Sequence, residues 1–403
     1  MKTDEKALHI IEELKKHGFI AYYAGGCVRD FLLGHASEDI DIATDAPPEA
    51  IRKIFPHTVP VGIAFGILIV IIDNRQYEVA TFRKETHHIS GRYPEKIEFT
   101  SAEMDAIRRD FTINGLFYDP KTDKIHDFVN GQKDLRNKII RAIGNPEERF
   151  FEDRLRMVRA ARFAARFGFE IEIKTWEAIQ KYAKELFPAV SIERIWHEIT
   201  KMAQKKHFKT ALHLLFESGL FKVIFPELKD LGAKEFEKRI RHIEKFSAKM
   251  PVIIRILELF ENFPLQGRLQ LGRRLKLSNY DLKVIEYIGM VQDGNDYYWA
   301  KTYANEFFDL YLEAASIRLG AQEKEFFLKK HHQKQQLLAP QILRLKEKRP
   351  LVTSQMLQTI GIRPGKQMGN LLQIAEEIAA CRHLDDAAAV LEILKKEISP
   401  TTP

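Results

Sequence analysis

The stretch GHASEDIDIATDAPPEA, residues 34–50, places two carboxylates at alternate positions of a short apolar segment. Asp39 and Asp41 alternate with Ile40 and Ile42, which is the pattern of a strand with one buried face. Side chains at positions i and i+2 of a strand point to the same face, so we expect the two aspartates to project together. Adjacent carboxylates repel unless a cation lies between them, and Mg²⁺ prefers such oxygen ligands. The stretch therefore predicts either a metal site or, more simply, an acidic turn that solubilises the chain.

A glycine pair lies upstream of this strand, in the segment AGGCVRDFLLG, residues 24–34. An apolar strand leads into Gly25 and Gly26, and a helix is predicted to begin at Cys27. Glycine lets backbone N–H groups approach a phosphate closely, and a helix N-terminus favours an anion. Arg29 lies in the first helical turn, where it can pair with a phosphate oxygen. The segment predicts a triphosphate site or an ordinary strand-to-helix turn, and it matches neither a Walker loop nor the G-x-G-x-x-G pattern.

Two downstream segments carry further charged candidates. The predicted strand YEVATFR, residues 77–83, contains Glu78, a third carboxylate that would complete a two-metal site or would be an exposed acid on an edge strand. The segment DAIRRDFTINGLFYDP, residues 105–120, contains Arg108 and Arg109, which are suited to contacting phosphate or RNA.

The segment FFEDRLRMVRAARFAARFGF, residues 150–169, is predicted to be one helix with a charged stripe. Asp153, Arg156, Arg159 and Arg162 recur every three residues, so the stripe turns by about 60° at each step. Asp153 and Arg156 are then neighbours, whereas Arg162 lies nearly opposite Asp153. Taken alone, such a stripe is also typical of a solvated, salt-bridged helix face.

The composition indicates a globular protein with more than one domain. The chain has 403 residues, of which 45% are hydrophobic and 30% are charged, and its longest apolar run, residues 67–72, is too short to span a membrane. Two cysteines argue against a disulfide framework and a structural zinc site, so we expect a cytoplasmic protein. The net charge of +7 weakly favours a polyanionic partner.

Strand patterns are concentrated before residue 145, and helical patterns fill the rest of the chain. We therefore predict an α+β fold: a small head with a mixed β-sheet and helices, followed by an elongated all-α remainder. The expected divisions are a catalytic head (1–145), a helical neck (146–205), a helical body (206–270) and a helical tail (271–403).

The motifs GGCVRD, EDIDIAT, RRDFTING and EDRLRMVRAARF, in this order and spacing, resemble the bacterial-type (class II) tRNA nucleotidyltransferase and poly(A) polymerase family. That family belongs to the polymerase-beta-like nucleotidyltransferase superfamily. The resemblance is specific over roughly residues 18–200 and becomes diffuse beyond about residue 271.

The resemblance implies a role for each candidate residue. Asp39 and Asp41 would bind two Mg²⁺ ions, with Glu78 as a third catalytic acid. Gly25, Gly26 and Arg29 would hold the triphosphate. Asp153 and Arg156 would read the incoming base, and the nucleotide pocket would also be lined by Arg109, Arg159 and Arg162.

The resemblance further implies template-independent addition of C, C and A to the 3′ end of tRNA from CTP and ATP. Poly(A) polymerase and partial enzymes that add only CC or only A remain alternatives, as does an inactive RNA-binding module. The segment ISGRYP, residues 89–94, departs from the family pattern because Tyr93 stands in place of an arginine and no acid precedes it. The oligomeric state is left open.

Overall fold

The computed structural model describes residues 4–37, 39–62, 65–88, 94–204 and 206–398. It divides into two compact units, Met1–Leu231 and Gly232–Pro403. Within the described ranges, no helix has the length and apolar character needed to cross a membrane. The four-part division predicted from the sequence stays a prediction.

The first unit contains a seven-stranded sheet with the strand order β3-β4-β5-β2-β1-β8-β9. Its strands are β1 (Ala21–Ala24), β2 (Asp41–Thr44), β3 (Thr58–Gly62), β4 (Ile67–Ile72), β5 (Arg75–Thr81), β8 (Leu116–Asp119) and β9 (Lys124–Asp127). The sheet is mixed, because β2 and β5 are parallel whereas the other neighbours are antiparallel. The predicted mixed-sheet head is thus confirmed.

The sheet aligns two of the candidate acids. Strand β2 begins at Asp41, which is paired in register with Glu78 of β5. Ile42 is buried, as the alternation predicts. The expectation that Asp39 belongs to the same strand is wrong, because β2 begins only at Asp41 and β1 ends at Ala24, too early to pair with Asp39.

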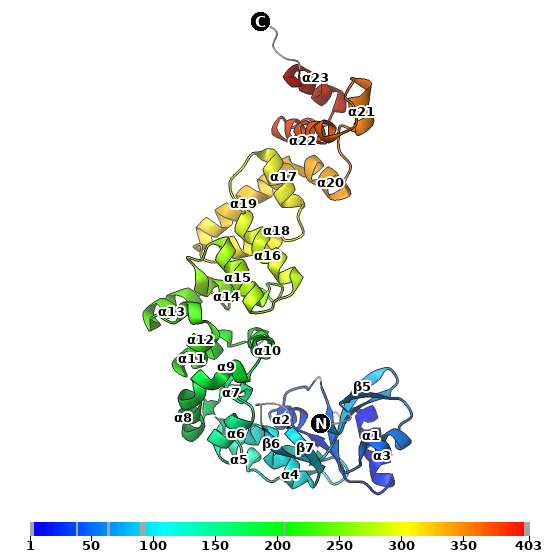
Figure 1. The fold of residues 1–403 in the computed structure, drawn as a ribbon, viewed down its shortest axis with the longest axis vertical. Coiled ribbons are helices and arrows are strands. Elements are labelled where there is room, and N and C mark those ends of the chain that lie inside the picture. The colour runs from blue at the N-terminus through cyan, green and yellow to red at the C-terminus, as the bar shows by residue number, and fades with distance from the viewer. Residues whose placement is uncertain (1–3, 38, 63–64, 89–93, 205, 399–403) are drawn as a thin grey trace. The chain divides into compact units, whose positions relative to one another are not determined.

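Helices flank this sheet in the head (Figure 1). They are α1 (Glu5–Lys16), α2 (Gly26–Leu32), α3 (Pro48–Ile54), α4 (Ala102–Ile107) and α5 (Gly131–Asn137). Helix α1 is amphipathic, with Ile10, Ile11 and Leu14 fully buried and Asp4 as its N-cap. Helix α2 follows directly from β1, so the strand-to-helix turn at Gly25 is fixed by the sheet.

Strand β5 is followed by a two-stranded antiparallel hairpin. It is formed by β6 (Arg83–His88) and β7 (Pro94–Phe99). Residues 89–93, which include the departure at Tyr93, lie outside the described residues.

The rest of the first unit is helical apart from a two-residue pair of strands, β10 (Ile139–Ile140) and β11 (Glu170–Ile171). Its helices are α6 (Pro146–Glu152), α7 (Leu155–Phe167), α8 (Ile173–Tyr182), α9 (Leu186–Ala189), α10 (Ile192–Ala203), α11 (Phe208–Glu217) and α12 (Leu220–Ile224). Helix α7 packs against α10 and α11, and its buried residues include Met157, Val158 and Ala161. Its position is therefore set on two sides.

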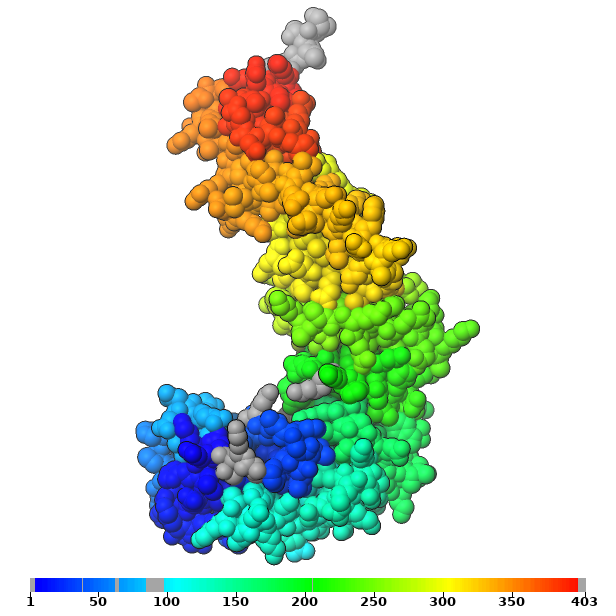
Figure 2. Space-filling model, turned by 180° about the vertical axis from the view of Figure 1, so that it is seen from behind, coloured from blue at the N-terminus to red at the C-terminus, as the bar shows by residue number. Residues whose placement is uncertain are grey.

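The second unit is built from helices, as predicted. They are α13 (Ala233–Ile240), α14 (Val252–Leu257), α15 (Leu265–Arg274), α16 (Asn279–Met290), α17 (Asp296–Ala304), α18 (Phe308–Ser316), α19 (Ala321–Leu337), α20 (Ala339–Glu347), α21 (Ser354–Thr359), α22 (Lys366–Cys381) and α23 (Ala387–Ile398). Helices close in sequence pack together, such as α15 with α16 and α22 with α23. Figure 2 shows this for the second unit, in which the helices follow one another in the order of the sequence, coloured from green to red.

Candidate active site

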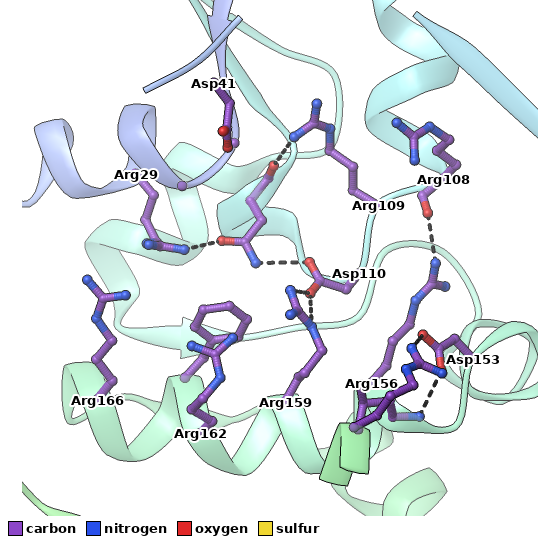
Figure 3. Close-up of a pocket in the computed structure, with 16 residues that line it drawn as sticks. Arg29, Asp41, Arg108, Arg109, Asp110, Asp153, Arg156, Arg159, Arg162 and Arg166 are labelled. Carbon is purple, nitrogen blue, oxygen red and sulfur yellow. Dashed lines mark hydrogen bonds and ion pairs between the residues drawn. The ribbon is translucent and has the colours of Figure 1, made fainter. Parts of the chain in front are cut away.

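A cavity of about 470 Å³ lies in the first unit and gathers most of the candidate residues. It is lined by Gly25, Gly26, Arg29, Asp41, Arg108, Arg109, Asp110, Asn114, Asp153, Leu155, Arg156, Arg159, Arg162, Phe163, Arg166 and Arg194. Figure 3 shows Arg156, Arg159, Arg162 and Arg166 facing Asp41 and Arg29. Eight of the lining residues are arginines and three are aspartates, so the cavity suits a polyanion.

Asp41 lies at the edge of this cavity, close to other carboxylates. Burial, and then the charges of Glu78 and Asp39, raise the pKa of Asp41 to about 6, although Arg109 and Arg29 act in the opposite direction. Glu78 and Asp39 are both exposed. Glu78 lines a neighbouring cavity of about 230 Å³, and Asp39 lines another of about 350 Å³.

These acids suit a hard divalent cation in chemistry, because a cation would relieve the repulsion that raises the pKa of Asp41. Among the described residues, however, no three side chains of aspartate, glutamate, histidine or cysteine converge closely enough to form a complete metal site. Nucleotide phosphates and water commonly supply the remaining Mg²⁺ ligands, so a partial protein site fits this ion.

The turn at Gly25 brings the backbone against Arg109. Gly25 has φ of 69°, and a Cβ atom at this position would lie 2.6 Å from Nη1 of Arg109. Arg109 in turn donates hydrogen bonds to Asp105 Oδ2 and, over 3.3 Å, to the carbonyl oxygen of Asn114. A side chain at position 25 would therefore displace an arginine of the cavity.

Arg29 is held in place from several directions. It is only 3% exposed, and its Nε and Nη2 both donate to Asp30 Oδ1, over 2.9 and 2.7 Å. Its Nη1 donates to Asn114 Oδ1, and its Cζ lies 4.8 Å from the ring centre of Phe167. Arg29 lines the large cavity, but its side chain is far more buried than a surface arginine in a helical turn, and its predicted contact with a triphosphate stays a prediction.

Helix α7 is joined to the head by an ion pair whose carboxylate, Asp110, is buried. Arg159 donates through Nε and Nη2 to Asp110 Oδ2, over 2.9 and 2.6 Å. Burial alone would raise the pKa of Asp110, but the Arg159 guanidinium and the Asn114 amide hold it well below its ordinary value. The pair fixes the side of α7 that faces the cavity.

Arg162 is also paired with a buried acid. Its Nε donates to Glu198 Oε2 on α10, and Glu198 is 3% exposed. The Cζ of Arg162 lies 4.0 Å from the ring centre of Phe163. Arg162 thus lines the cavity together with Arg156 and Arg159, although helical spacing alone places it far round the helix.

The continuous helix predicted over residues 150–169 is wrong, because the chain leaves helical geometry at Asp153. Helix α6 ends at Glu152, and Asp153 has φ of −148°. Its Oδ1 accepts a hydrogen bond from the N–H of Leu155 at the start of α7, and its Oδ2 accepts one from Arg194 Nη2 over 2.7 Å. Asp153 and Arg156 still line the same cavity, but Asp153 reaches it from the break between two helices.

Arg156 is held by partners in α6 and in the segment that follows α4. Its Nη1 donates to Glu152 Oε2 over 2.7 Å and its Nη2 to the carbonyl oxygen of Arg108 over 3.0 Å. An arginine has five donor hydrogens and a carboxylate accepts about four hydrogen bonds, so Arg156 and Asp153 both keep capacity for a ligand.

Nine of the predicted site residues line one cavity, and Asp39 and Glu78 line its two neighbours. Sequence reasoning missed six lining residues, which are Asp110, Asn114, Leu155, Phe163, Arg166 and Arg194. Arg166 continues the arginine stripe by one further turn and was detectable from that spacing. Arg194 has no such signal, because its position depends on how α10 packs against α7.

Two family descriptions match parts of this chain. "Poly A polymerase head domain" matches residues 21–141, and "Probable RNA and SrmB- binding site of polymerase A" matches residues 168–231. The first match spans the sheet, and the second spans most of the helices that pack on α7.

Similar proteins extend over the whole chain. The CCA-adding enzyme of Ligilactobacillus salivarius is 37% identical over 402 residues, which cover 97% of this chain and 96% of that protein. The CCA-adding enzyme of Streptococcus gordonii is 32% identical over 98% of this chain and 97% of its own length.

Solved structures of similar fold include the Bacillus stearothermophilus CCA-adding enzyme in complex with CTP. Its TM-score is 0.76 and its identity 27%, with 98% of each chain covered. The Thermotoga maritima CCA-adding enzyme complexed with tRNA_CCA has a TM-score of 0.65 at 19% identity, covers 99% of this chain and 97% of its own, and supports the fold alone. On its sequence and its fold, this chain belongs to the family of the CCA-adding enzymes.

Proposed function

We propose that this protein is a tRNA nucleotidyltransferase that adds C, C and A, without a template, to the 3′ end of tRNA from CTP and ATP, releasing pyrophosphate. The observation that carries the proposal is the arginine-rich cavity, in which Asp41 of the sheet faces the α7 stripe across a space suited to a nucleotide. The family membership and the CTP complex of the Bacillus stearothermophilus enzyme support it.

Asp41 lines three cavities. This supports the idea that the base, the phosphates and the RNA 3′ end each occupy a different cavity. The largest holds Asp153 and Arg156, the second holds Arg29, Asp39 and Lys201, and the third holds Glu78. In-line transfer requires the attacking hydroxyl and the leaving pyrophosphate on opposite sides of the α-phosphorus. We therefore assign the base to the first cavity, the β- and γ-phosphates to the second and the RNA 3′ end to the third.

Asp39 and Asp41 would hold Mg²⁺, with Glu78 beside the RNA hydroxyl. When bound, Mg²⁺ would activate that hydroxyl and neutralise charge on the triphosphate. Arg29 and the backbone at Gly25 and Gly26 would orient the phosphates.

Asp153 and Arg156 would select the base. Cytosine and adenine each present an exocyclic amino donor beside a ring-nitrogen acceptor. A carboxylate accepts from the amino group and an arginine donates to the ring nitrogen. Uracil and guanine present the reversed pattern and would leave both side chains mispaired, which is strongly unfavourable in a buried site.

A single incubation series tests the reaction. The purified protein is given tRNA without its 3′ CCA, tRNA ending in CC, and an unstructured RNA, each with labelled CTP or ATP and Mg²⁺. We expect CCA on the first substrate, A on the second and little on the third. Chelation by EDTA should abolish transfer, and a comparison of Mg²⁺ with Ca²⁺ tests the identity of the ion.

Poly(A) polymerase is the second candidate, because the matched head family bears that description. Long adenosine tracts on the unstructured RNA would favour it, and failure to use CTP would leave addition of A alone.

A cytoplasmic location stays a prediction that rests on the two cysteines, both free thiols in the structure.

A further inference from the structure

Asp30 is a buried carboxylate to which neither the sequence pattern nor the proposed reaction assigns a role. It is 5% exposed and lies on α2, one residue after Arg29. Its Oδ1 accepts two hydrogen bonds from Arg29, and its Oδ2 accepts one from Arg166 Nη2 on α7, over 3.1 Å. A single carboxylate thus joins two arginines that come from different elements.

Both of these arginines line the two cavities assigned to the nucleotide. Arg29 and Arg166 appear in the wall of the large cavity and in that of the smaller one beside Asp39. Each guanidinium also lies over the Phe167 ring, with Cζ 4.8 Å from its centre in both cases. Stacking on Phe167 sets the plane of each guanidinium group. The hydrogen bonds to Asp30 set how each guanidinium is rotated within that plane.

We propose that Asp30 is a positioning residue, which orients Arg29 and Arg166 toward the triphosphate of the incoming nucleotide. The proposal rests on the proposed function and extends it to Asp30, which lines the smaller cavity and acts there through the two arginines that it holds. Without Asp30, Arg29 would keep Asn114 Oδ1 as its hydrogen-bonded side-chain partner among the described contacts. Its guanidinium would still be held by Asn114 and stacked on Phe167, but its rotation within the plane of the stack would no longer be fixed on the side of α7.

A purely electrostatic role predicts the opposite effect. A carboxylate beside a phosphate site repels the phosphate, so its removal would strengthen anion binding. Positioning requires both the charge and its location. Asp30→Asn tests the charge, and Asp30→Glu keeps the charge but moves the carboxylate by one methylene group.

The experiment measures binding of CTP, CMP and inorganic pyrophosphate by calorimetry, with Mg²⁺ present and RNA absent. We expect both variants to lose affinity for CTP and pyrophosphate, by up to about a hundredfold, because misplacement of a positioned group has effects of this order. CMP, which lacks the β- and γ-phosphates, should bind almost as well as to the wild type. The ratio of CTP to CMP affinity is therefore the readout, and a general loss of stability would not change it.

Asp119→Asn is the matched control, because Asp119 is a buried head carboxylate paired with Lys15 outside these cavities. It should lower thermal stability and leave the CTP to CMP ratio unchanged. Tighter pyrophosphate binding by Asp30→Asn, or wild-type affinities in Asp30→Glu, would overturn the proposal. If the wild type binds neither CTP nor pyrophosphate, the nucleotide site itself is wrong and the proposal with it; equal binding by wild type and variants refutes only the role of Asp30. Should Asp30→Asn not fold, Asp30→Glu alone decides.

Discussion

At Asp41 the chain holds a carboxylate in a position that is unfavourable for folding. Its pKa is raised to about 6, first by burial and then by Glu78 and Asp39. An acid whose folded pKa lies above its unfolded value destabilises the fold as pH rises through that range. Asp41→Asn should therefore raise Tm by a few degrees at pH 7.5 in EDTA, and the gain should vanish below about pH 4. In Mg²⁺, the same variant should lose more than about a hundredfold in transfer rate. A fall in Tm at pH 7.5 would contradict this account of the site.

Gly25 provides a second test at the scale of one residue. Gly25→Ala would place a methyl group 2.6 Å from Arg109 Nη1 at a backbone φ of 69°. Because ψ is −122° there, Gly25 lies outside the left-handed helical region as well; the backbone strain costs about 1–3 kcal/mol, and the displaced arginine should additionally weaken CTP binding. Gly144→Ala is the control, because φ is 70° there and a Cβ would meet no atom within 4 Å. We expect both variants to lose Tm and only Gly25→Ala to bind CTP more weakly. Equal CTP binding in both variants would contradict the steric argument.

At the scale of elements, strand alternation and glycine placement predicted strands β2 and β5 and the turn between β1 and α2. The turn between β4 and β5 could be predicted from Asp73 and Asn74, because aspartate and asparagine tolerate the positive φ that a tight hairpin requires. Both residues adopt positive φ in the structure. The break between α6 and α7 was not, because no glycine or proline marks it. Asp153 leaves the helix to cap α7 and pair with Arg194, and such a tertiary contact has no local signature.

The joint between α7 and the head gives a prediction of pH dependence. The pKa of Asp110 is lowered despite its burial, because Arg159 and Asn114 stabilise the charged form. An acid with a depressed folded pKa contributes stability above its unfolded pKa, near 3.9, and that contribution is lost as pH falls further. Asp110→Asn should cost about 1–3 kcal/mol at pH 7, since it removes the doubly hydrogen-bonded partner of Arg159 and leaves Glu198 Oε1, 3.5 Å from Arg159 Nη1, as its remaining acid among the described residues. Denaturant unfolding at several pH values should show the difference from the wild type shrinking below about pH 4, and a difference independent of pH would argue against the ion pair.

At the scale of the whole molecule, all residues that line the large cavity belong to the first compact unit, Met1–Leu231. A fragment of residues 1–231 should therefore fold and bind CTP with the affinity of the full chain.

The second unit, Gly232–Pro403, is helical and includes basic positions such as Arg273 and Arg274 at the end of α15, which suits contact with RNA phosphates. The fragment should accordingly bind tRNA more weakly, with a higher KM for tRNA and a smaller dependence of binding on salt. Calorimetry with CTP and filter binding with tRNA separate the two effects. An unchanged KM for tRNA would exclude the second unit from RNA binding, and a fragment that folds but binds no CTP would show that the nucleotide site depends on residues beyond 231.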